Sequence, residues 1–154
     1  MEINTQRCLI RRFQESDLTS FMAYHNDLEW MRYQGLKGLT KQAYAAILLG
    51  DEDLTKGVQL AIISRETGAL LGDIYLKQAD DSCWLGYSIR RTEARHGYAF
   101  EAVSAVIRRL KEQGITTIKA EVARANVPSL GLLKKLNFID QASTGTELLL
   151  TLRL

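Results

Sequence analysis

The sequence predicts an α/β chain of the α+β kind, in which helices flank a mixed, mostly antiparallel sheet. Three observations predict this fold class. Residues 58–89 form β-rich runs separated by short polar turns, which is typical of sequential antiparallel strands. Apolar residues between positions 99 and 110 recur with the period of one helix face. Residues 116–123 then alternate like a strand, and a leucine-rich helical pattern follows them.

The first fifty residues predict a strand followed by helices. Residues 7–12 alternate weakly and predict the strand. Apolar residues at i, i+3 and i+4 predict an amphipathic helix at about residues 16–25, and residues 28–33 are expected to form a short second helical piece. Thr40 is a suitable N-cap for a further helix, which Gly50 would terminate.

The middle of the chain predicts an antiparallel meander that leads into the longest helix. Strands are expected at residues 58–64, 70–77 and 84–89, with turn residues between them. Gly97 leads into the helix. Gly114 is expected to end it, because glycine accepts the left-handed conformation common just after a helix.

The last forty residues predict a strand, a helix and a closing hairpin. Asn126 is a good N-cap for the helix that follows strand 116–123. Residues 138–139 begin another strand, Thr144-Gly145 turns, and residues 147–154 form the final strand. The resulting order is β-α-α-β-β-β-α-β-α-β-β. An apolar final strand at a sheet edge needs cover, so a homodimer through residues 147–154 is one expectation.

Composition predicts a single domain over residues 1–154, with 46% hydrophobic and 25% charged residues. The net charge of +2 comes from well-mixed charges, unlike the basic stripe of nucleic-acid-binding proteins. No stretch approaches the ~20 apolar residues of a membrane helix, and the first residues do not resemble a signal peptide. Cys8 and Cys83 have no metal-ligand spacing. We therefore expect a cytoplasmic protein without a metal, a nucleic-acid partner or a membrane partner.

A candidate anion site lies where strand 84–89 passes through a small-residue turn into the long helix. The first amides of a helix have no internal partner, and the helix dipole is positive there. A phosphate is therefore expected on the amides of residues 95–99, with charge added by Arg95 and His96. The alternative is that Gly97 simply turns the chain.

Two motifs resemble those of the GNAT N-acetyltransferases. Residues 94–99, Ala-Arg-His-Gly-Tyr-Ala, resemble the loop that binds the pyrophosphate of acyl-CoA, and the run Gly-Tyr-Ala-Phe-Glu-Ala is similar to the RimJ/RimL-like branch. Ala94 departs from the usual Gln or Arg. In residues 121–138, Asn126 and Ser129 match the second family block, although Asn137 replaces its usual glycine. The resemblance covers nearly the whole chain and implies the GNAT acyl-CoA N-acyltransferase fold.

The resemblance also implies acetyl-CoA as a co-substrate. Strand 84–89 would bind the pantetheine arm through its backbone, and a main-chain N–H near Ile89 would polarise the thioester carbonyl. Asn126 would contact the CoA arm, although its role as an N-cap explains it equally well. The residues expected to bind the co-substrate are Tyr87, Ile89, Arg95, His96, Gly97, Tyr98, Ala99 and Asn126.

Two residues are catalytic candidates. Ser129 resembles a serine that can assist the leaving thiolate, and its alternative role is a backbone contact in the first helical turn. Glu121 matches a glutamate that serves related enzymes as a base through water, and its alternative is a surface ion pair. Trp30, Arg32 and Tyr33 are expected to line the acceptor site.

These residues favour transfer of an acetyl group to a primary amine by direct attack in a ternary complex. The first hypothesis is a protein N-terminal amine of the ribosomal-protein type. The second is a small amine such as a polyamine, an amino acid or an antibiotic, and an acidic cleft would favour a polyamine. The third is a CoA-binding or interaction module without catalysis, which the departures at Ala94 and Asn137 keep open.

Overall fold

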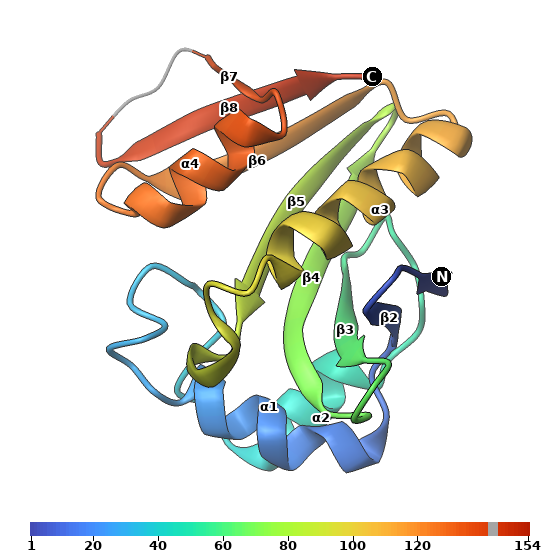
Figure 1. Cartoon of the computed structure of the whole chain (residues 1–154), viewed down its shortest axis with the longest axis vertical. Coiled ribbons are helices and arrows are strands. Elements are labelled where there is room, and N and C mark those ends of the chain that lie inside the picture. The colour runs from blue at the N-terminus through green and yellow to red at the C-terminus, as the bar shows by residue number, and fades with distance from the viewer. Residues whose placement is uncertain (142–144) are drawn as a thin grey trace.

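One central sheet carries helices on both of its faces (Figure 1). The computed structural model describes residues 1–141 and 145–154. Its strands are β1 (Ile3–Asn4), β2 (Cys8–Arg12), β3 (Val58–Ser64), β4 (Leu70–Ala79), β5 (Ser82–Ile89), β6 (Thr117–Ala123), β7 (Ile139–Asp140) and β8 (Glu147–Arg153). Its helices are α1 (Leu18–His25), α2 (Lys41–Leu48), α3 (Tyr98–Glu112) and α4 (Val127–Lys135), with short 3-10 turns η1 (Glu15–Asp17) and η2 (Arg91–Glu93).

Alternating residues of the strands pack into two separate cores. In β3, Leu60 and Ile62 join the core beneath α3, whereas Ala61 and Ile63 join the core beneath α1 and α2. Successive strand residues point to opposite faces, so one strand supplies both cores. This explains why β3 is an almost continuous apolar run instead of an alternating one.

The sheet opens between β5 and β6, and this opening positions the site. The strand order is β1-β2-β3-β4-β5-β6-β8-β7, and β5 and β6 are the parallel pair. Their pairing covers only Ser82–Trp84 with Thr117–Lys119. Beyond Trp84, β5 stays with β4 and β6 stays with β8, so the two strands separate as Figure 1 shows.

Most predicted elements are confirmed, together with their caps. Thr40 Oγ1 accepts a hydrogen bond of 3.2 Å from the Ala43 amide and caps α2. Gly114 follows α3 with φ 91° and Asn137 follows α4 with φ 72°, both in the left-handed region. The turn expected at Thr144-Gly145 lies partly outside the described residues, and Gly145 itself has φ 69°.

The structure corrects two expectations. The short strand β1 was not predicted, because two residues carry no periodic signal. The helical piece expected at residues 28–33 is wrong, since these residues form successive turns. Met31, only 1% exposed, is drawn into the core beneath α1 and α2, and the Trp30 indole bonds the backbone of β5. These tertiary contacts outweigh the local helical preference.

The final strand, β8, is paired on one side along its whole length and is partly covered on the other. β8 pairs with all of β6 on one side, and β7 covers Leu150 and Thr151 on the other. The homodimer through this strand stays a prediction. In the described ranges, no helix has the length and apolar character needed to cross a bilayer.

Candidate active site

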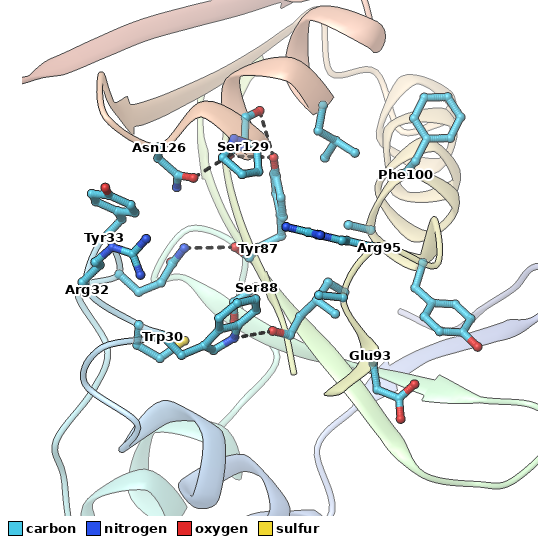
Figure 2. A pocket seen from close by; sticks show the side chains of 18 of the residues that line it. Trp30, Arg32, Tyr33, Tyr87, Ser88, Glu93, Arg95, Phe100, Asn126 and Ser129 are labelled. Atoms are coloured by element: carbon cyan, nitrogen blue, oxygen red, sulfur yellow. Dashed lines mark hydrogen bonds between the residues drawn. The ribbon is translucent and has the colours of Figure 1, made fainter. Parts of the chain in front are cut away.

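The opening between β5 and β6 holds a pocket of about 390 Å³. It is bounded by the segment between α1 and α2, by the end of β5, and by the first turns of α3 and α4 (Figure 2). Of the predicted site residues, those lining it are Trp30, Arg32, Tyr33, Tyr87, Ile89, Arg95, Gly97, Tyr98, Ala99, Asn126 and Ser129.

Two predicted residues lie outside the lining of this pocket. His96 is exposed, and its ring Nδ1 lies 3.1 Å from the Glu93 carbonyl oxygen. Glu121 is exposed on β6 and lines a smaller neighbouring pocket of about 50 Å³. Tyr33 and Ser129 line both pockets, so Glu121 borders the same region from the β6 side.

The N-terminus of α3 lies at one end of the pocket. Gly97 is the N-cap with φ 79°, and the Glu101 amide makes the first intrahelical bond, 3.1 Å to the Gly97 carbonyl. Helix geometry therefore leaves the amides of residues 98–100 without an intrahelical acceptor. The Thr40 side chain caps α2 and the Asn126 side chain caps α4. Gly97 has no side chain that could cap α3 in the same way. Arg95 also has positive φ, 65°, and Figure 2 shows its side chain pointing into the pocket.

A cluster formed by the segment between β1 and β2 and by the first turn of α3 holds this loop from behind. The Arg7 guanidinium donates 2.7 Å to Glu101 Oε1 and 2.8 Å to the His96 carbonyl, and it lies 4.5 Å from the centre of the Tyr98 ring. Burial alone would raise the pKa of Glu101, but hydrogen bonds from Thr5 and Arg7 outweigh it and lower that pKa. Glu101 is therefore an ionised anchor for Arg7, and Arg7 fixes the turn before α3.

The backbone at the end of β5 faces the opening. The Ile89 carbonyl accepts 2.8 Å from Trp30 Nε1, and the Tyr87 carbonyl accepts 3.3 Å from Gln34 Nε2. The N–H and C=O of one strand residue point to the same side, so the Ile89 N–H also faces the opening. This edge can bind a planar amide arm and polarise a carbonyl oxygen.

A hydroxyl pair lies at the centre of the pocket. Tyr87 Oη is 2.8 Å from Ser129 Oγ, and the Ser129 amide donates 3.4 Å to Asn126 Oδ1 (Figure 2). Burial raises the pKa of Tyr87 to about 12, so the phenol stays protonated near neutral pH. Asn126 is thus the N-cap of α4, while the Ser129 hydroxyl is paired with the Tyr87 hydroxyl from β5.

Sequence reasoning missed several contributors to this site. It assigned the Tyr87 backbone but not the Tyr87 hydroxyl, and it named neither Gln34 nor Ser88, which also line the pocket. Strand alternation gave a partial signal for Ser88. It places the Ser88 side chain on the opposite face of β5 from Tyr87, where a polar residue within a buried strand is unusual. The partner of the Tyr87 hydroxyl is 42 residues away in sequence and carried no local signal.

The histidines and cysteines show no further constellation in the described ranges. Within residues 1–141 and 145–154, no group of three or more His, Cys, Asp and Glu is arranged to hold a metal ion. Cys8 and Cys83 are buried and free. Burial raises the pKa of Cys83 to about 11, which makes it a poor nucleophile.

Comparison with known proteins identifies relatives of this architecture. A family model described as an acetyltransferase (GNAT) domain matches residues 7–139. The uncharacterized N-acetyltransferase YnaD of Bacillus subtilis is 27% identical over 139 residues, covering 88% of this chain and 81% of the relative. A GNAT-family acetyltransferase structure from Bacillus anthracis has a TM-score of 0.87 at 20% identity, covering 99% of this chain and 98% of that one. The structure of RimL, a ribosomal L7/L12 alpha-N-protein acetyltransferase in complex with coenzyme A, has a TM-score of 0.84 at 11% identity, covering 100% and 98% of the chains.

Proposed function

Because this chain belongs to the GNAT acetyltransferase family, we propose that it transfers acetyl from acetyl-CoA to the N-terminal amine of a protein, by direct attack in a ternary complex. One observation carries the proposal. A single pocket joins the N-terminus of α3 to an aromatic wall, with Ser129 and the open edge of β5 between them. A co-substrate with a phosphate end and a thioester end fits the first part, and an amine acceptor fits the second.

The residues present fit acetyl-CoA. The amides at the start of α3, with Arg95, would hold the pyrophosphate. The backbone of Tyr87 and Ile89 would hold the pantetheine arm, and the Ile89 N–H would stabilise the oxyanion. When bound, acetyl-CoA supplies an acetyl thioester, whose carbonyl carbon accepts the amine nitrogen while the C–S bond breaks and the amine proton passes to sulfur.

The protein side chains then have two tasks. Glu121 would take a proton from the incoming ammonium through water, so that the amine attacks in its neutral form. Ser129, supported by Tyr87, would donate a hydrogen bond to the departing thiolate. Holding amine and thioester together supplies much of the remaining rate without a covalent intermediate.

The charges of the pocket favour an N-terminal amine over a polyamine. Its charged lining residues are Arg32, Arg95 and Glu93, a balance that does not attract a polycation. The RimL structure, named for action on a protein N-terminus, shares the fold. A polypeptide acceptor also suits the exposed position of Tyr33 at the pocket.

Thermal unfolding with acetyl-CoA tests co-substrate binding. A ligand at 100 times its Kd stabilises by about 2.7 kcal/mol, which for this length raises Tm by roughly 5–10 °C. Gly97→Ala should weaken acetyl-CoA binding several-fold, because its Cβ would lie 3.3 Å from the Arg7 guanidinium and would displace the side chain that fixes the turn before α3. Gly68→Ala is the matched control: its φ of 74° imposes the same backbone strain in a remote hairpin turn with open space around it. Equal acetyl-CoA affinity in the two variants would contradict the phosphate site.

Acceptor specificity is tested with matched peptides. We expect acetylation of a peptide with a free N-terminus, none of the same peptide with a blocked N-terminus, and slower turnover of a polyamine. Acetylation of the polyamine alone would replace the N-terminal acceptor with a small amine. If no peptide or amine consumes acetyl-CoA, the enzymatic proposal fails, and the CoA-binding module takes its place.

A further inference from the structure

Four polar side chains meet in the core next to the pocket. Tyr24 and His25 on α1, Asp73 on β4 and Ser88 on β5 are each at most 8% exposed. Phe21 stacks on the His25 ring with centroids 3.8 Å apart. Such a group is costly to bury unless its members satisfy one another. The chemistry proposed above does not use it.

The contacts of His25 define its protonation. Nδ1 is 2.6 Å from the Leu36 carbonyl oxygen, which can only accept, so Nδ1 carries a proton. Nε2 is 2.7 Å from Asp73 Oδ2, which also accepts 2.6 Å from Ser88 and a further hydrogen bond from Tyr24. An oxygen that already accepts from two hydroxyls is a carboxylate oxygen, so Nε2 carries a proton as well. His25 is then an imidazolium ion.

The Tyr24 phenol supports this assignment. Burial, together with the charge of Asp73, raises the pKa of Tyr24 well above its ordinary value. Tyr24 therefore stays protonated and donates to Asp73. The carboxylate of Asp73 is the shared acceptor of the cluster, and His25 is its cationic partner.

His25 connects the sheet to the acceptor segment, residues 26–39, which joins α1 to α2. This segment consists of turns and bends and carries Trp30 and Gln34, whose side chains bond the open edge of β5. At its far end, Leu36 accepts from His25. Its backbone makes only isolated turn hydrogen bonds, such as 2.9 Å from the Met31 amide to the Asp27 carbonyl, so the position of the segment depends on such side-chain contacts.

We propose that His25 is a positioning residue: its two ring nitrogens join the Leu36 carbonyl to the Asp73 side chain, and so fix the acceptor segment against β5. A residue that bonds only one of these groups cannot hold both. We call this link from the Leu36 carbonyl through His25 to Asp73 the tether. The protonation of His25 and the tether are properties of the fold, whereas the consequence for acceptor binding rests on the proposed function.

The protonation is tested by nitrogen NMR of the ring at neutral pH. We expect both His25 nitrogens to be protonated in the wild type, with the signal assigned by its loss in His25→Gln. In Asp73→Asn, the new amide N–H can donate to Nε2, so His25 should carry one proton. A wild-type His25 with one protonated nitrogen, unchanged in Asp73→Asn, would overturn the ion pair.

The tether is tested by amide hydrogen exchange. His25→Gln should accelerate exchange across residues 26–39 by roughly tenfold or more, whereas Asp73→Asn, which keeps a hydrogen-bonded pair, should change it by less than about threefold. Val106→Ala is the control, because it removes core volume beneath α3 without touching the cluster. Equal acceleration of this segment in His25→Gln and Val106→Ala would refute a positioning role.

Kinetics link the tether to the acceptor. With a peptide bearing a free N-terminus, His25→Gln should raise the KM for the peptide about tenfold while the Kd for acetyl-CoA stays within about twofold. An equal loss of affinity for both ligands would contradict a local role. If the wild type acetylates no peptide, the proposed function fails. The NMR and hydrogen-exchange results still show whether His25 is protonated on both nitrogens and whether it holds residues 26–39 in place.

Discussion

Replacing Tyr87 with phenylalanine removes one hydroxyl group beside Ser129 and leaves the ring packing in place. The two hydroxyl oxygens are 2.8 Å apart. Loss of a neutral hydrogen bond costs about 1 kcal/mol of folding free energy, or roughly 2–4 °C in Tm for a chain of this length. The variant should therefore fold, and its kinetics will report on chemistry.

The expected catalytic loss follows from the pKa of Tyr87. Burial raises this pKa to about 12, whereas an ordinary thiol has a pKa near 8.5, so proton transfer from the phenol to a thiolate would be uphill by about 5 kcal/mol. The hydroxyl pair therefore donates a hydrogen bond to the thiolate and does not give up a proton. A hydrogen bond to a charged group contributes about 1.5–3 kcal/mol, so losing the Ser129 bond altogether would lower kcat roughly 10- to 150-fold. Tyr87→Phe, which removes the group that orients Ser129, should lower kcat by up to this amount.

The assay is thiol release at saturating acetyl-CoA with a fixed peptide acceptor. Tyr75→Phe, the same change on β4 outside the pocket lining, should leave kcat unchanged. Because Tyr87 and Ser129 act as one unit, the double variant Tyr87→Phe/Ser129→Ala should be about as slow as the slower single variant. Wild-type kcat in Tyr87→Phe would refute the assignment of this pair to the leaving group.

Three further predictions concern the base, the loop and alkaline stability. Glu121→Gln should lower kcat most at low pH, where the acceptor is an ammonium ion, and a uniform loss or none in the pH–rate profile would exclude Glu121 as the base. Arg7→Ala should raise the Kd for acetyl-CoA several-fold by calorimetry, whereas Arg109→Ala, which removes an Arg–Glu pair near the other end of α3, should leave it unchanged. Because folding raises the pKa of Tyr87 from about 10 to about 12, its contribution to stability is complete below pH 10 and is lost as the pH rises through 12. Tyr87→Phe should therefore have a shallower alkaline stability decline than the wild type, and parallel declines would contradict the raised pKa.

Local sequence was sufficient for most of the secondary structure. The helix periodicity, the Thr40 and Asn126 caps and the left-handed residues Gly114 and Asn137 depend on neighbours within one or two turns, so their signals lie within short windows. The failure at residues 28–33 has the opposite cause. There the chain follows contacts made by Trp30 with β5, which no short window contains.

The same division holds for the candidate site. The Gly97 turn and the block around Asn126 were recognisable because a helix N-terminus needs particular residues at fixed local spacing. Only the tertiary structure decided where β5 and β6 separate and that Tyr87 meets Ser129. It also decided that His25 meets Asp73 across 48 residues, because the partner of a buried polar group is whichever donor or acceptor the packed chain brings within about 3 Å. The sequence alone thus determined the family and the glycine turn before α3, and long-range packing determined which side chains meet around them.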